Sequence, residues 1–303
     1  MTRSLFFMRR TTVALACLWA TGAAPAQVAQ PHMRDRVDGE LRQLSAMAAQ
    51  PPDVDPLDLN RLPEPVRRYV AYTGLDRQPL ARYARIRFTG EVRLPQTGGH
   101  ERVDAATPWM AMTGSQTMAL SKAGLGYVWD TRWTNPRFAV DVRDRYVNGQ
   151  THIWAVRDDG TVLIDEGDEA MAATYLIRFF AEATQAPAML MPGPHLRWEA
   201  VDAGSARAHV RDGAISASML CRFDARGALT ECESNDRKLR FSGDVAERWV
   251  PARWVMTRGN YREMAGLRLP TTMSIRWVLG GGEFEQVREV IDEVVFETAG
   301  RAQ

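Results

Sequence analysis

The chain has 303 residues, a formal net charge of +1 and 25% charged residues. This near-neutral balance is not typical of nucleic-acid binders or of proteins with acidic tails, so we expect no nucleic-acid partner. The length suits one large β-rich domain or two small domains.

The N-terminus has the three parts of a secretory signal peptide. A basic stretch ends at Arg10, an apolar run follows from Val13 to Trp19, and Ala24-Pro25-Ala26 has the small-residue pattern of a cleavage site. The apolar run is shorter than the ~20 residues that span a bilayer. We therefore expect residues 1–26 to be removed and the protein to be periplasmic or secreted. Translation from Met8 in place of Met1 and a lipid anchor at Cys17 are open alternatives.

Two short helices are expected before the first strand. Residues 33–49 carry good helix formers with a weak apolar stripe, and the proline-rich residues 51–56 indicate a linker. A second helix is expected at 63–73, ending before Gly74, which can adopt a left-handed cap. We interpret residues 27–60 as a helical arm and linker, and residues 61–298 as a single antiparallel β domain.

From residue 80 the hydrophobic period changes to two. Between residues 84 and 94, Ile86, Phe88 and Val92 share one face and charged residues take the other. Turn signals such as Asn148-Gly149 and Asp212-Gly213 separate the later runs, which indicates an antiparallel meander. Further strands are expected at 108–120, 125–134, 137–147, 151–157, 161–165, 196–202, 206–212, 214–223, 228–234, 237–242, 252–262, 268–279 and 283–297.

One helix interrupts the strands at residues 168–184 and places large apolar residues along one side. The pattern predicts a mainly β fold with this helix inserted. We expect a large curved antiparallel sheet or half-open barrel that the helix covers, with the short N-terminal helices added. The 9 tryptophans and 14 methionines fit either ordinary core packing or the walls of a hydrophobic cavity.

Cys221 and Cys232 flank a turn at residues 224–227 and take nearly matched positions on two hairpin strands. Neighbouring strands bring such residues close enough for a disulfide, and an exported protein meets an oxidising compartment. A bulge at Gly227 would shift the register by one residue, which leaves two unpaired buried thiols as the alternative.

The chain carries no recognisable catalytic motif. Its five histidines form no H-E-x-x-H pair, and no G-x-S-x-G or glycine-rich phosphate loop is present. We therefore expect no metal and no cofactor, and favour binding over enzymatic activity.

Two sets of acidic residues allow more than one interpretation. Asp165, Glu166, Asp168 and Glu169 precede the inserted helix, where they either stabilise its N-terminal end or provide an acid/base pair. Asp144 alternates onto the apolar side of its strand, where a carboxylate is costly unless it is paired. It is either a structural anchor or a polar group in a ligand cavity.

The order of several short motifs resembles a bacterial exported domain family of unknown function. They are LPEPVRRYVAYTGL, GYVWDTRW, VRDRYVNG, the segment from DEGDE to RFFAE, LRWEAVD followed by VRDG, RFDARGALTE and GNYREMAGLRLPTTMSIRWVL, and the resemblance spans about residues 62–296. Asp168 stands where the family often has proline, and Gln185-Ala186 replace a usual aromatic residue. The resemblance implies a fold similar to the periplasmic lipoprotein carriers (LolA-like), whose curved sheet and helical lid bind acyl chains. It implies no catalytic residues.

Our leading hypothesis is an exported, non-enzymatic binding protein, expected to be monomeric. It would hold a lipid, acyl chain or other hydrophobic small molecule on the concave face of the sheet, with residues 168–184 and the Pro187–Pro194 loop as a lid. The expected ligand-binding residues are Trp129, Asp144, Tyr146, Arg178, Phe179, Phe180, Trp198 and Tyr261. The alternatives are a cell-envelope hydrolase that uses Asp144 with the Asp165–Glu169 acids, and a structural envelope protein with a filled core.

Overall fold

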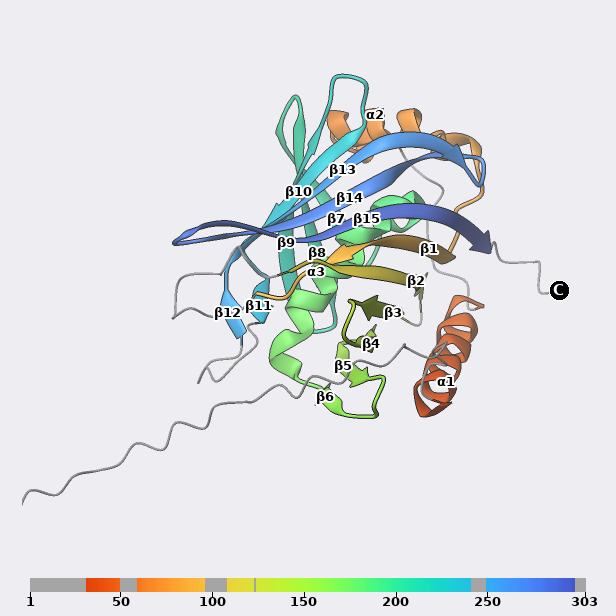
Figure 1. Cartoon of the computed structure of the whole chain (residues 1–303). Helices are drawn as coiled ribbons and strands as arrows, with labels where there is room; N and C mark the ends of the chain where they lie inside the picture. The colour runs from red at the N-terminus through yellow and green to blue at the C-terminus, as the bar shows by residue number, and fades with distance from the viewer. Residues whose placement is uncertain (1–30, 50–58, 96–107, 123, 241–248, 298–303) are drawn as a thin grey trace, which may run out of the picture.

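The computed structural model describes residues 31–49, 59–95, 108–122, 124–240 and 249–297 (Figure 1). The expected signal peptide, the alternatives at Met8 and Cys17, and the linker at 51–56 lie outside the described residues. Among the helices that are described, none is long and apolar enough to cross a membrane.

Thirteen antiparallel strands form one sheet in the order β6-β5-β4-β3-β2-β1-β15-β14-β13-β10-β9-β8-β7. The fold is mainly β with one large curved antiparallel sheet, as the sequence predicts. The strands are β1 (Tyr83–Val92), β2 (Met110–Ser121), β3 (Gly124–Thr134), β4 (Ala139–Val147), β5 (Gln150–Arg157), β6 (Val162–Glu166), β7 (Leu196–Asp202), β8 (Ser205–Asp212), β9 (Ile215–Phe223), β10 (Leu229–Ser234), β13 (Arg253–Met264), β14 (Leu267–Leu279) and β15 (Gly282–Glu297). A separate pair consists of β11 (Lys238–Arg240) and β12 (Trp249–Pro251).

The sheet curves until strands that are distant in its order approach each other. The hydroxyl of Tyr146, on β4, donates a hydrogen bond to Asp212 at the end of β8, over 2.7 Å. A side chain added at Gly149, after β4, would come within 2.9 Å of Ile215 at the start of β9. The β4–β5 and β8–β9 turns therefore meet, and the sheet forms a half-open barrel with a concave inner face.

The helix α3 (Ala172–Glu182) lies inside this curve and is covered on nearly all sides (Figure 1). A helix with apolar residues on most of its sides is typical of a protein core, and most residues of α3 are apolar. Leu176, Ile177, Phe179 and Phe180 have no exposed surface, and the rings of Phe179 and Phe180 pack edge to face 5.0 Å apart. The expected helix at 168–184 is present with a shorter α-helical part, since 3₁₀ turns flank it at Glu169–Met171 and Ala183–Gln185.

The helix α1 (Pro31–Ala48) packs on the convex face of the same sheet. Val128 of β3 contacts the cluster of α1, whereas its neighbour Tyr127 stacks on Tyr175 of α3, so the two helices lie on opposite faces. The polar face of β4 is consequently covered, and Arg143 is only 1% exposed beside Glu40 of α1.

The helix α2 (Glu64–Thr73) ends as expected at Gly74, which has a φ of 77° and supplies the left-handed cap. Its Tyr69 hydroxyl donates to the carbonyl of Thr184, just after α3. This contact ties α2 to the C-terminal end of the buried helix.

Cys221 of β9 and Cys232 of β10 are direct register partners, with Cα atoms 4.2 Å apart, and they form a disulfide. The hairpin has a register irregularity between Leu229 and Glu231, yet the cysteines still face each other. The prediction of this pair is confirmed, and both side chains are fully buried.

Replacing both cysteines, as Cys221→Ala/Cys232→Ala, is expected to lower the free energy of unfolding by about 2–3 kcal/mol, because the bond closes a short loop in the unfolded chain. Urea unfolding measures this loss. A reductant should destabilise the wild type by a similar amount and leave the variant unchanged. Identical urea midpoints for oxidised and reduced wild type would contradict the bond.

Candidate functional site

A buried ion-pair network joins α3 to the concave face of the sheet. Arg178 of α3 donates from Nε to Glu182, one helical turn later, over 2.7 Å. Its Nη1 donates to the carboxylate of Asp144 on β4. All three side chains are nearly buried, and so this arginine neutralises two carboxylates in a place where charge is costly.

The surroundings of Arg178 keep it charged. Its guanidinium lies 4.6 Å from the ring centre of Trp129 and 5.3 Å from that of Tyr127. Burial alone would lower the pKa of Arg178, but the carboxylates of Glu182 and Asp144 outweigh burial and hold that pKa well above its usual value. Cation–π contact adds to the attraction.

Three further ionisable residues belong to the same region. They are Arg237 before β11, Arg258 on β13 and Glu289 on β15. Burial and the nearby Glu182 raise the pKa of Glu289 to about 8, against the opposing effect of Arg258. Burial lowers the pKa of Arg237 to about 10. We call these six residues the charge cluster: Asp144, Arg178, Glu182, Arg237, Arg258 and Glu289.

The geometry of the charge cluster favours anchoring over catalysis. Asp144 is held by Arg178, which matches the interpretation of Asp144 as a structural anchor. Two of the acids before α3, Asp165 and Glu166, do not lie beside it. Asp165 points to the convex face, where it lies 2.9 Å from Nε2 of His152 and 4.0 Å from Arg36 of α1.

Glu166 lies on the same row as Asp144, but two strands away, which is about 10 Å between backbones. Asp165 and Glu166, the two acids of this set that lie on β6, are therefore on opposite faces of the sheet, so these two do not form one cleft with Asp144.

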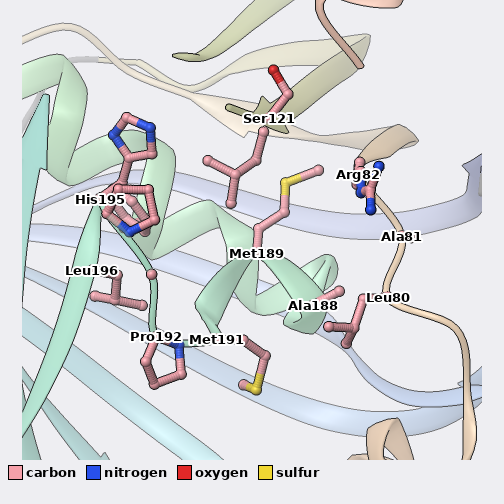
Figure 2. Close-up of a pocket in the computed structure, with 14 residues that line it drawn as sticks. Leu80, Ala81, Arg82, Ser121, Ala188, Met189, Met191, Pro192, His195 and Leu196 are labelled. Atoms are coloured by element: carbon pink, nitrogen blue, oxygen red, sulfur yellow. The ribbon is translucent and has the colours of Figure 1, made fainter. Parts of the chain in front are cut away.

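An apolar cavity of about 170 Å³ opens at the C-terminal end of α3. Phe180 of α3 and the segment after it form one wall, including the 3₁₀ turn η5 (Pro187–Leu190). The opposite walls come from the residues before β1, the end of β2 and the start of β7 (Figure 2). The lining residues are Leu80, Ala81, Arg82, Leu120, Ser121, Phe180, Ala188, Met189, Met191, Pro192, Gly193, Pro194, His195 and Leu196.

A larger groove of about 580 Å³ lies on the convex side, beside α1, and its character is different. Acidic and basic side chains line it, among them Asp130, Asp141 and Asp292. Burial and the neighbouring Asp141 raise the pKa of Asp130 to about 6. No group of three or more metal-binding side chains occurs within the described residues, this groove included.

A family model described as "Family of unknown function (DUF6544)" matches residues 52–288, most of the chain. The chain belongs to this family. No curated protein matches it.

Two solved structures are similar to this DUF6544 protein. One is a LolA superfamily protein from Nitrosomonas europaea, with 10% identity and a TM-score of 0.37, covering 77% of this chain and 92% of the other. The second is a beta-barrel-like protein of the domain of unknown function DUF1849 from Brucella abortus, with 9% identity and a TM-score of 0.29, covering 73% of this chain and 99% of the other.

The eight residues expected to bind a ligand do not form a single site in the DUF6544 protein. Phe180 lines the apolar cavity. Trp129, Asp144 and Arg178 belong to the charge cluster or contact it. Phe179 is buried in the core, and the remaining three use their polar atoms within the fold: Tyr146 on Asp212, Trp198 on the carbonyl of Leu190, and Tyr261 on the carbonyl of Leu229.

Several residues of the site were not predicted from the sequence. Arg237, Arg258 and Glu289 carry no motif, and Glu182 was given no role although it ends the RFFAE segment of the family resemblance. Their burial depends on strands that lie far apart along the chain. One signal was available for Glu289, because strict alternation along β15 places it with apolar residues. Met189 and Met191 were counted among the 14 methionines, but the sequence did not indicate which of these methionines would line a cavity.

Replacing Arg178 with methionine should lower the free energy of unfolding by about 3–5 kcal/mol, because two buried carboxylates lose their counter-ion. Chemical denaturation at pH 7 measures the effect. A triple variant, Asp144→Leu/Arg178→Met/Glu182→Leu, should recover part of the loss, since neither carboxylate is left without Arg178. A loss below 1 kcal/mol in the single variant would contradict the anchoring role.

Glu289→Gln should stabilise the protein at neutral pH. The folded-state pKa of about 8 exceeds the ordinary value of 4.5, so the folded wild type holds a proton that the unfolded chain releases. Its stability therefore falls as the pH rises from about 4.5 to 8, whereas the variant lacks this slope. The gain at pH 7 should be on the order of a few kcal/mol, relative to the exposed control Glu293→Gln. Parallel stability–pH curves for wild type and variant would contradict the shift.

Proposed function

We propose that this DUF6544 protein is an exported binding protein without catalytic activity, and that its ligand is a hydrophobic small molecule or the end of an acyl chain. The observation that carries the proposal is the apolar cavity beside α3. The leader sequence supports export, because its basic, apolar and small-residue parts follow in the order of a secretory signal.

The walls of the cavity suit an apolar ligand. Phe180, Leu196 and Met189 are almost fully buried, and they contribute to a surface that is mostly apolar. Two methionines, Met189 and Met191, give walls that can adapt to ligands of different shape. Ligand sites in proteins are typically apolar clefts with a few placed polar groups, and the cavity has this composition.

The size of the cavity limits what can enter it. An engineered apolar cavity of about 150 Å³ holds benzene, so about 170 Å³ suits a moiety of about six carbons. The remainder of the concave face is filled by α3. We therefore place the ligand at the end of the helix, rather than along the whole concave face.

The segment from Pro187 to Pro194 is suited to act as a lid. It forms one wall of the cavity and carries Met189 and Met191 into it. Its end is held by the reciprocal bridge between Gly193 and Leu196, and its Leu190 carbonyl accepts a hydrogen bond from Trp198. An opening of this segment would admit a ligand without removing α3 from the core.

Filling the cavity with Ala188→Phe should abolish binding of hexan-1-ol while leaving the melting temperature unchanged or higher, since the new ring occupies apolar space. Ligand-detected NMR titration measures the binding. Ala200→Phe, at an exposed position of β7, is the matched control and should bind as the wild type does. Equal binding by wild type and Ala188→Phe, or no binding by the wild type, would contradict the proposal.

A further inference from the structure

The apolar cavity is lined by one arginine whose guanidinium has a buried nitrogen without a hydrogen-bond partner. Arg82 lies among its lining residues, directly before β1. Its Nη1 is buried without a hydrogen-bond partner anywhere in the part of the chain that the structure describes. In the view of Figure 2, Met189 lies between Arg82 and His195.

The position of Arg82 is fixed by the fold. Its backbone carbonyl accepts a hydrogen bond from the N–H of Leu120 at 2.9 Å, which attaches this residue to the end of β2. The backbone of Arg82 is therefore fixed at the cavity, and the residue forms part of the cavity wall. A buried donor on a charged group is costly when it is left unpaired, and Arg178 shows the paired arrangement, with two carboxylates bound.

An anionic group on the ligand would supply the missing partner. We infer that the cavity binds an amphiphile, an alkyl chain that carries a carboxylate or phosphate, and that Arg82 pairs with this anionic head. The planar guanidinium matches both groups in geometry, and such charge-assisted bonds are among the strongest that side chains make. This inference rests on the proposed function, and it adds the chemical class of the ligand.

His195 is a second polar group of the cavity, and its ring is held in place. Its Nδ1 lies 3.0 Å from the carbonyl oxygen of Arg211, a contact in which Nδ1–H donates. His195 therefore presents a fixed imidazole at the cavity wall, on the other side of Met189 from Arg82 in the view of Figure 2.

The test compares three six-carbon probes on the purified protein: hexan-1-ol, hexanoate and hexyl phosphate. The wild type should bind at least one anionic probe about ten- to a hundredfold more tightly than the alcohol, which corresponds to one hydrogen-bonded charge pair. Hexanoate and hexyl phosphate distinguish a carboxylate from a phosphate head. In Arg82→Gln this preference should fall to near one, whereas Arg82→Lys should keep part of it because the charge remains.

Arg85→Gln is the matched control, since Arg85 lies three residues later, on β1, and is exposed. It should keep the full preference, and its melting temperature and that of Arg82→Gln verify folding. Equal binding of alcohol and anions by the wild type would overturn the anionic head and leave the apolar cavity as a site. Preference retained in Arg82→Gln would overturn the role of Arg82. Failure of all three probes would overturn the cavity as a ligand site and this inference with it.

Discussion

The double ion pair of Arg178 is the interaction on which the architecture depends. A sheet of this size leaves a wide apolar concave face, and one helix covers it only if the helix is held at a fixed height and rotation. Arg178 does this by joining Asp144 of β4 to Glu182 of its own helix. Because a partly satisfied buried charge is costly, small displacements of α3 are opposed more strongly than apolar packing alone would oppose them.

The fixed position of α3 explains where a ligand can bind. Leu176, Ile177 and Phe179 of the helix fill the centre of the half-open barrel. A filled core of this kind was expected under the alternative hypothesis of a structural envelope protein. The filling stops after the 3₁₀ turn Ala183–Gln185 that follows α3, where η5 forms one wall of the cavity. Anchoring and binding are therefore separate: the charge cluster orders the helix, and the segment after the helix forms the site.

Local pattern was sufficient for most of the fold. Alternation predicted the strands and the inward direction of Asp144, and turn residues such as Asn148-Gly149 predicted the meander. The three-residue strand β12 was missed because so short a run has no period. The charge cluster could not be predicted as a unit, since Arg258 and Glu289 approach α3 only through the curvature of the sheet. The covering of Arg143 by α1 likewise depends on tertiary packing.

The most direct test of a cavity beside an anchored helix is methyl NMR of protein labelled with ¹³C at its methionines, titrated with hexan-1-ol. Met189 and Met191 line the cavity. Met118, on β2, is buried in the main core, and Met33 of α1 packs on the convex face. We predict shifts in the methyl signals of Met189 and Met191, with those of Met118 and Met33 unchanged. Shifts confined to Met33, or equal shifts at all methionines, would contradict ligand binding at the end of α3.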